Sequence, residues 1–390
     1  MSANVGKANE LRERKAKVMQ MGGTGAIEKQ HSRNKMTARE RIDLLLDMDT
    51  FSEIDALIKH RCNFFDMGER QIPADAAVCG HGKIEGRHVF VATEDFTTLA
   101  GTFGEMHGKK FCKVLDLAAE AGAPFIQMID SGGARLQEGQ DSSEVYAQVF
   151  RRHTLYSGVI PQISLLMGSC GGGAAYGPAL TDFIITVDGI GRMYMGGPAF
   201  VRTMLGEEKT EEDLGGAKVH SQITGLCDLV ARNDDHALAL AKELLSFLPP
   251  NCREKPPITD TGDAPNRRHE NILNILPDNT RHLFDMHKII AEIVDNGYFF
   301  ETKPHYAGNM IPCFARLNGQ PVGILANQSL VKGGVIDVHA ANKHARFVRI
   351  CDSFNIPIIH IQDSPGVMIG QEEEYRALDR RCCMQLQKQL

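Results

Sequence analysis

The 390-residue chain contains no tryptophan, and aromatic residues make up only 6% of it. Its ten cysteines never form a C-x-x-C pair, so the usual signal for a structural zinc site or a dithiol redox centre is missing. A G-K-S or G-K-T triplet is also missing, which excludes a Walker A phosphate loop. The sequence therefore predicts a protein without a metal site, whose cysteines stay reduced as they do in the cytoplasm.

The charge balance excludes a further class of protein. Lys and Arg number 43 against 49 Asp and Glu, and this net charge of -6 argues against a nucleic-acid-binding surface. Residues 154–181 carry no charge, but Pro161 and three consecutive glycines at 171–173 interrupt them. Such a stretch predicts a buried strand followed by a buried helix and no membrane span.

Strand-like and helix-like patterns alternate along most of the chain. Residues 1–50 form a polar helical lead-in that is broken by glycines at 22, 23 and 25. Apolar and β-branched runs then predict strands, and a periodic segment at 104–121 predicts a helix. The predicted strands are 88–96, 124–130, 162–167 and 182–187. This alternation predicts an α/β architecture with helices packed on sheets.

A polar segment rich in proline and charge, 249–268, indicates the boundary between two domains. We expect an N-terminal domain over 1–255, a linker over 256–269 and a C-terminal domain over 270–390. An amphipathic helix is predicted at 283–295, after which strands and helices alternate again.

The second half repeats the first at a constant distance. Gly86 and Gly319 lie 233 positions apart, and at this offset nine of the 48 positions 86–133 are identical. The matches include Asp130 with Asp363 and Ser131 with Ser364. Residue frequencies predict roughly three matches by chance, so the pattern indicates a duplicated domain. Two unrelated α/β domains that both follow a strand with a glycine turn are the alternative.

Two glycine-rich turns, at 130–135 and 168–178, each follow a predicted strand and lead into a helix. Glycine lets backbone N–H groups approach a ligand and point in one direction, as an oxyanion hole requires. Close packing of helix on strand is the alternative use of such glycines. Cys170 in the second turn is a candidate nucleophile, which would need a histidine as base. The alternative for Cys170 is a small buried residue.

Taken together, these residues resemble the carboxyltransferase (β) subunits of propionyl-CoA and related acyl-CoA carboxylases. The resemblance covers nearly the whole chain. It rests on the segments 35–42, 95–97 with Gly101, 130–139, 168–170 with 172–174, 206–208, 214–217 with His220, and 363–366.

The resemblance implies a tandem duplication of the crotonase-like fold and a defined chemistry. The first copy would bind acyl-CoA, and the second would bind biotin carried on a partner protein. Carboxybiotin would release CO2 between two protomers, and the acyl-CoA enolate would attack it. Biotin carboxylase and biotin carboxyl carrier subunits would be the partners, and the family forms homo-oligomers, typically hexamers.

The resemblance also assigns residues. It implies that Gly172 and Gly173 form the oxyanion hole for the thioester. It places Gly132, Gly133, Ala134 and Arg135 in the same substrate pocket, with Arg135 also able to brace the loop. It places Ser364, Pro365 and Gly366 on the biotin side. For Lys35, Arg39 and Arg41, a solvated or interface helix is expected in preference to contacts with CoA phosphates.

Three departures from the family pattern stand out. Gly171 replaces the family's usual alanine and is expected only to loosen the turn, and Asn34 stands where the family has glycine. At the 233-residue offset, the residues of the second copy that correspond to Gly172 and Gly173 would fall beyond Leu390. The second copy is therefore expected to be incomplete, and the 390 residues alone are expected to be inactive.

Three alternatives remain open from the residues. The chain could belong to a biotin-dependent decarboxylase that pumps sodium, since its partners would decide the direction. It could be a crotonase-fold hydrolase that uses Cys170, or a non-catalytic subunit that only assembles.

Overall fold

The computed structural model describes residues 3–279, 282–376 and 378, and it divides into two compact units. Unit 1 comprises the chain up to His220 together with Val230–Lys242, and unit 2 comprises Ser221–Leu229 and the chain from Glu243 onward. The last part of the expected C-terminal domain, 379–390, lies outside the described residues. The expected linker at 256–269 stays a prediction.

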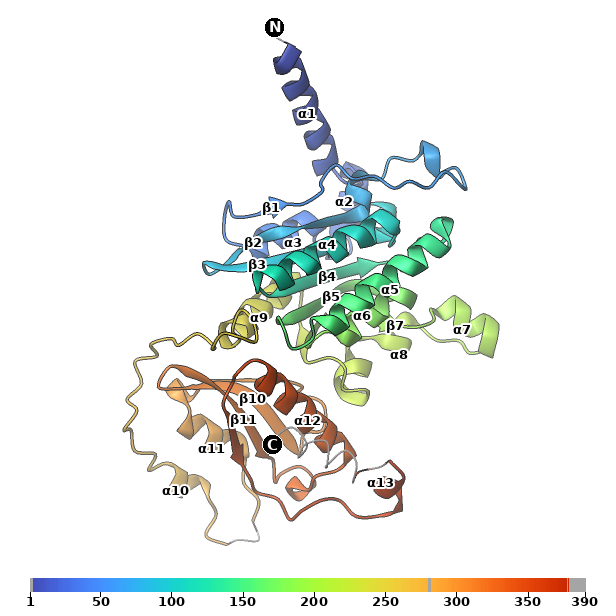
Figure 1. Ribbon diagram of the computed structural model, residues 1–390. Helices are drawn as coiled ribbons and strands as arrows, with labels where there is room; N and C mark the ends of the chain where they lie inside the picture. The colour runs from blue at the N-terminus through green and yellow to red at the C-terminus, as the bar shows by residue number, and fades with distance from the viewer. Residues whose placement is uncertain (1–2, 280–281, 377, 379–390) are drawn as a thin grey trace. The chain divides into compact units, whose positions relative to one another are not determined.

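Unit 1 is built on one mixed sheet with the strand order β1-β2-β3-β4-β5-β6-β8, and β7 pairs with the end of β5 (Figure 1). The first three strands are antiparallel, and β3 to β6 are parallel. The strands are β1 Ser52–Glu53, β2 Ala77–Ile84, β3 Arg87–Glu94, β4 Phe125–Ser131, β5 Gln162–Gly171, β6 Phe183–Val187, β7 Arg192–Tyr194 and β8 Leu229–Ala231.

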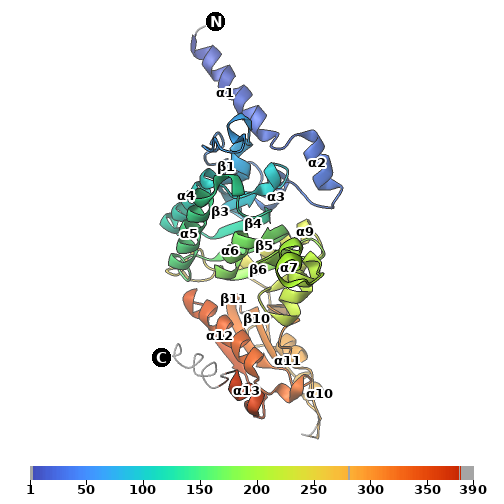
Figure 2. The same cartoon turned by 90° about the vertical axis from the view of Figure 1, so that its right-hand side faces the viewer.

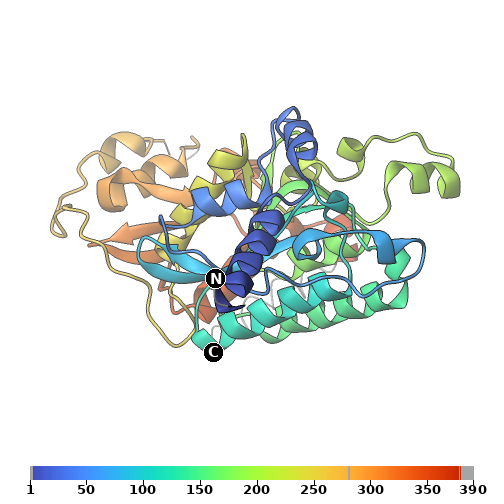
Figure 3. The ribbon, with the colours of Figure 1, turned by 90° about the horizontal axis from the view of Figure 1, so that it is seen from above.

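Helices cover this sheet. Helices α4 (Glu105–Ala121) and α5 (Gln140–Leu155) run side by side along one face (Figure 3), and α3 lies on the other (Figure 2). Helix α4 buries residues three and four apart, and Gly122 ends it in a left-handed conformation. The remaining helices are α1 Ala3–Met19, α2 Thr24–His31, α3 Ala38–Leu45, α6 Tyr176–Leu180, α7 Pro198–Leu205, α8 Glu211–Gly215 and α9 Asp234–Phe247.

Unit 2 carries a smaller sheet with the order β12-β11-β10-β9, in which only β11 and β12 are parallel. Its strands are β9 Phe299–Glu301, β10 Met310–Leu317, β11 Gln320–Asn327 and β12 Ile358–Ile361. Its helices are α10 Ile272–Ile275, α11 Met286–Ile293, α12 Val338–Ser353 and α13 Gln371–Tyr375. The apolar side of α11 packs with β10 and β11 in one core.

Short helical turns connect these elements in both units. The 3₁₀ turns are η1 Met67–Glu69, η2 Pro73–Ala76, η3 Leu99–Gly101, η4 Leu136–Glu138, η5 Gly172–Ala175, η7 Asp295–Gly297 and η8 Lys332–Gly334, and η6 Val219–Ile223 is a π-helical turn.

The two units repeat one another element by element. Strands β2 and β10 begin 233 positions apart, and so do β3 and β11, η3 and η8, and α4 and α12. Helices α3 and α11 begin 248 positions apart, so the first copy has about 15 additional residues between β1 and β2, within segment 54–76. The structure thus confirms the duplication of a crotonase-like α/β fold that the sequence predicts.

Each predicted strand and helix is present, but three differ in their bounds by more than one residue. The helix predicted at 283–295 is shorter, since α11 spans only Met286–Ile293, and β3 ends at Glu94 and not at 96. Strand β5 continues beyond its predicted end at 167 to Gly171. Its last residues, Ser169–Gly171, pair with β7, and this pairing holds the first glycines of the turn in extended conformation.

Candidate active site

Both glycine-rich turns border a single pocket of about 630 Å³, here called the glycine pocket. Four of the predicted site residues from the turns, Gly132, Gly133, Gly172 and Gly173, line it together with Ala134. The other lining residues are Phe96, Ser131, Leu136, Ser169, Gly171, Tyr194, Met195, Gly196, Gly197, Phe200 and Glu211. The glycines and Ala134 have little or no side chain, so one wall of this pocket is formed mainly by backbone atoms.

The first turn begins where β4 ends. The hydroxyl of Ser131 donates to the carbonyl of Gly101 at 2.7 Å and accepts from the N–H of Gly133 at 3.1 Å. Gly133 has a φ of 92°, and a Cβ on it would lie 2.7 Å from the carbonyl oxygen of Gly171. The two turns thus approach one another so closely that only glycine fits at this position.

The second turn leads from β5 into the helical segment formed by η5 and α6. Gly172 has a φ of 60°, and the N–H groups that follow it belong to the first helical turn, where they have no acceptor within the helix. A Cβ on Gly173 would lie 3.0 Å from the ring of Tyr146, which is itself buried and stacked on Phe103. Gly173 is therefore fixed between a rigid aromatic pair and the pocket.

Arg135 is fully buried and is not among the residues that line the glycine pocket. Its guanidinium pairs with Asp75, lies 2.8 Å from the carboxylate of Glu138, and donates to the carbonyl of Thr102 at 2.7 Å. Burial raises the pKa of Asp75, although Arg135 acts on it in the opposite direction. The arrangement ties the first glycine turn to the segment that precedes β2.

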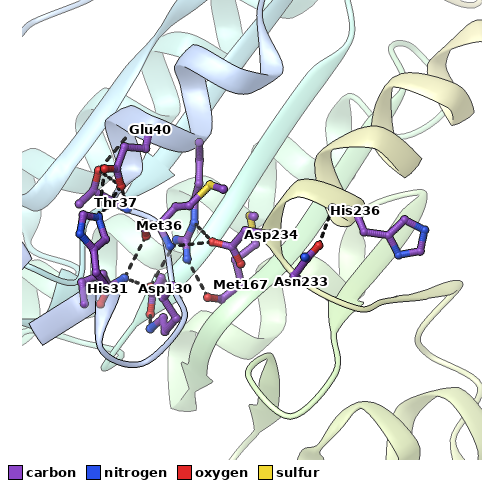
Figure 4. Close-up of polar contacts among 12 residues, drawn as sticks. His31, Met36, Thr37, Glu40, Asp130, Met167, Asn233, Asp234 and His236 are labelled. Atoms are coloured by element: carbon purple, nitrogen blue, oxygen red, sulfur yellow. Dashed lines mark hydrogen bonds and ion pairs between the residues drawn. The ribbon is translucent and has the colours of Figure 1, made fainter. Parts of the chain in front are cut away.

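A buried ion cluster holds Asp130, the first residue of the same turn (Figure 4). The carboxylate of Asp130 accepts from Lys35 at 2.6 Å and Arg41 at 3.3 Å, and from the amide of Gln30 at 2.8 Å. Arg41 also pairs with Asp234 at 2.8 Å and is fully buried. Burial lowers the pKa of Lys35, in spite of the opposite effect of Asp130.

This cluster corrects the expectation for the 35–42 segment. Lys35 and Arg41 are neither solvated nor directed at a ligand, because their charges neutralise buried carboxylates. Arg39 is likewise engaged, with its guanidinium 2.9 Å from the carboxylate of Glu53. No local pattern predicts the contacts of Lys35 and Arg41, because their partners Asp130 and Asp234 lie 95 and 193 residues away along the chain.

Cys170 is fully buried behind the second turn. Burial, and then the nearby Glu94, raise the pKa of its thiol well above the usual range. A nucleophilic cysteine needs an accessible thiolate, so the hypothesis of a Cys170 hydrolase does not fit this structure. The reading of Cys170 as a small buried residue does.

The turn in unit 2 repeats two hydrogen bonds of the first turn, those from the N–H of Gly133 to the Ser131 hydroxyl and from the N–H of Phe103 to the carbonyl of Gly133. The serine hydroxyl differs, because Ser364 donates to the carbonyl of Gly366 at 3.1 Å, whereas Ser131 donates to Gly101. The N–H of Gly366 donates to the hydroxyl of Ser364 at 3.1 Å, and the carbonyl of Gly366 accepts from Ile336 at 3.0 Å. Pro365 and Gly366 are exposed, and Ser364 is half-buried. The predicted biotin-side residues thus form one continuous surface turn.

Comparisons with known proteins match most of the chain. Residues 29–386 match the model of the carboxyl transferase domain family. The chain is 46% identical to methylmalonyl-CoA decarboxylase subunit alpha of Veillonella parvula, over 96% of this chain and 74% of that protein. It is 45% identical to the propionyl-CoA carboxylase beta chain of Roseobacter denitrificans, over 94% of this chain and 72% of that protein.

Solved structures agree with these matches. The hexameric transcarboxylase 12S core, with methylmalonyl-CoA bound, aligns with a TM-score of 0.96 and 41% identity, over 100% of this chain and 75% of that one. None of the helices in the described part of the chain has the length and apolarity to cross a bilayer.

The family match, the relatives and the solved structures agree with one another. They show that the chain belongs to the carboxyl transferase domain family, as a biotin-dependent acyl-CoA carboxyltransferase with the crotonase-like fold.

Proposed function

We propose that this chain transfers a carboxyl group between carboxybiotin and the α-carbon of a short-chain acyl-CoA of the acetyl or propionyl type. The observation that carries the proposal is the meeting of both glycine turns in one pocket of about 630 Å³. Backbone N–H groups in such a pocket can stabilise negative charge on a thioester oxygen, and the reaction develops its charge on that oxygen.

Each part of the glycine pocket has a role in this proposal. The N–H groups of Gly172 and Gly173 bind the thioester oxygen as it becomes an enolate, and Gly132, Gly133 and Ala134 form the facing wall. Arg135 positions this wall from behind through Asp75 and Glu138. Carboxybiotin, delivered by a carrier protein, supplies the CO2 and accepts the α-proton.

The second unit takes the biotin side in this proposal, with Ser364, Pro365 and Gly366 at its turn. The repeated hydrogen bonds of that turn support the assignment. The partners would be biotin carboxylase and biotin carboxyl carrier subunits, and the hexameric neighbour supports a homo-oligomer. The cytoplasm is the proposed compartment, since the cysteines within the described residues are free thiols.

A second direction of reaction has specific support. Two of the relatives are methylmalonyl-CoA decarboxylase alpha subunits, at 46% and 44% identity. The same pocket would then receive methylmalonyl-CoA and transfer its carboxyl group to biotin. Loss of the carboxyl group from methylmalonyl-CoA in the presence of free biotin would favour this direction.

Calorimetric titration tests the substrate class. We expect the folded chain to bind acetyl-, propionyl- or butyryl-CoA more tightly than CoA without an acyl group, because the glycine turns contact the thioester. Titrations of CoA alone give the reference. No heat with any of the three acyl-CoA compounds would contradict the proposal.

Substitution of Gly173 tests the role of the second turn. Gly173→Val adds bulk where a Cβ already lies 3.0 Å from Tyr146, so the turn must shift. In a version of the protein whose second copy is complete, we expect carboxyl transfer between acyl-CoA and biotin to fall roughly 100- to 1000-fold, as for the loss of an oxyanion-hole donor. Gly177→Ala is the control, since its Cβ would meet its nearest atom at 3.7 Å. Near-normal turnover in Gly173→Val would contradict the assignment of Gly173 to the oxyanion hole.

A further inference from the structure

A pair of facing residues, Gly171 and Tyr194, lies beside the proposed oxyanion hole. Strands β5 and β7 place these two residues directly opposite each other in the sheet. A Cβ on residue 171 would lie 3.1 Å from the ring carbon Cε2 of Tyr194, which is tighter than ordinary contact. The glycine at position 171 therefore leaves room for an aromatic ring, and its effect is not limited to loosening the turn.

The ring of Tyr194 is held at its far end as well. Its hydroxyl donates to the carboxylate of Glu211 at 3.1 Å, and Glu211 pairs with Arg192 at 3.3 Å. Glu211 is the first residue of α8, and Thr210 caps this helix through reciprocal bonds with Asp213. Burial, as the largest cause, raises the pKa of Tyr194, so its hydroxyl stays a donor at neutral pH.

This restraint distinguishes Tyr194 from its neighbours in the glycine pocket. Met195 and Phe200 also line the pocket, but they are 56% and 62% exposed. Long side chains with this exposure can move aside for a ligand at low cost, whereas the ring of Tyr194 is tethered through its hydroxyl to Glu211. A fixed ring beside the Gly172–Gly173 turn limits the space next to a thioester carbon bound there.

We propose that Tyr194, seated against Gly171 and anchored by Glu211, is a specificity-determining residue that restricts the acyl group to short chains. This inference rests on the proposed function, because the acyl group must enter the glycine pocket. It adds to that function the residue that sets the size limit, and it gives the space left by Gly171 a role in seating that residue.

Affinity profiles across acyl lengths test the proposal. Acetyl-, butyryl- and hexanoyl-CoA are titrated calorimetrically into the wild-type chain and into Tyr194→Ala. We expect the wild type to bind hexanoyl-CoA poorly, and Tyr194→Ala to improve hexanoyl-CoA binding relative to acetyl-CoA by about tenfold or more, as removal of a steric limit allows. Tyr156→Ala is the matched control, because the Tyr156 hydroxyl bonds Asp116, at 2.6 Å, and does not line this pocket.

Two further variants keep the test decisive if Tyr194→Ala fails to fold. Gly171→Ala should push the ring into the pocket and lower the ratio of butyryl-CoA to acetyl-CoA affinity, and Tyr194→Phe should weaken the length limit by releasing the ring from Glu211. Unchanged profiles in the folded variants would overturn the role of Tyr194. A wild type that binds no acyl-CoA would instead overturn the proposed function.

Discussion

Strand β4 of the first fold copy and strand β12 of the second occupy equivalent places, but their surroundings differ. Every residue of β4 is buried between the parallel neighbours β3 and β5, whereas β12 pairs with β11 and its residues are half-buried or exposed. Both strands nevertheless lead into the same hydrogen-bonded turn, at Ser131–Gly133 and at Ser364–Gly366. Local sequence thus suffices to form the turn, and long-range contacts determine how firmly it is held.

The buried lysines of the two copies also show which contacts the copies share and which they do not. The amine of Lys110 in α4 donates to the carbonyls of Ala74 and Ala77, and that of Lys343 in α12 donates to the carbonyls of Tyr306 at 2.7 Å and Ala307 at 3.4 Å. Ala307 lies 233 positions after Ala74, so this one contact recurs at the repeat offset. The ion cluster of Asp130 does not recur, because among the described residues Asp363 forms no ion pair.

Removing each of the two equivalent aspartates should give the largest difference between the copies. Asp130→Ala leaves Lys35 and Arg41 with less counter-charge in a buried site, and we expect the free energy of unfolding of unit 1 to fall by about 3–5 kcal/mol. Asp363→Ala should change stability by less than about 0.5 kcal/mol. Chemical denaturation of both variants measures the difference, and equal losses would show that the cluster contributes nothing particular to the first turn.

A smaller and more nearly equal effect is expected at the glycines that precede the two turns. Gly101 and Gly334 have φ values of 61° and 73°, and a Cβ would lie 2.3 Å from the carbonyl oxygen of Asp130 and 2.6 Å from that of Asp363. Replacement by alanine should cost about 1–3 kcal/mol in either copy. We expect the larger loss for Gly101→Ala, since the residues around it are buried. A larger loss for Gly334→Ala, measured by thermal unfolding, would reverse the comparison.

The smallest effect is a dependence of stability on pH. Burial lowers the pKa of Lys343 to about 7, from 10.5. The unfolded chain keeps this proton while the folded chain loses it above pH 7, so stability rises with pH in that window. Between pH 7 and 8 the gain should be about 1 kcal/mol, and Lys343→Met should remove it. Urea denaturation at both pH values checks this, and an unchanged slope in the variant would assign the rise to other groups.

Periodicity and turn chemistry were enough to predict most strands and helices, the duplication and the two glycine turns. They act over a few residues, or over a fixed offset that can be read directly from the sequence. Contacts between distant residues could not be found this way: Asp130 with the segment 30–41, Arg135 with Asp75, and Tyr194 with Gly171. Several of these residues stand in motifs that the sequence singles out, but each contact depends on which segments the fold brings together, and no motif indicates its distant partner.

The additional residues between β1 and β2 have a consequence for how the two copies could have diverged. Segment 54–76 includes Asp75, the partner of Arg135, and at the repeat offset Arg135 corresponds to Met368. Asp75 itself corresponds to Gly308 at the same offset, so the second copy lacks both members of the pair. The two residues are thus interdependent, because an arginine at this buried place without its carboxylate would be strongly destabilising. Either copy can therefore carry both members of the pair or neither of them, but not the arginine alone.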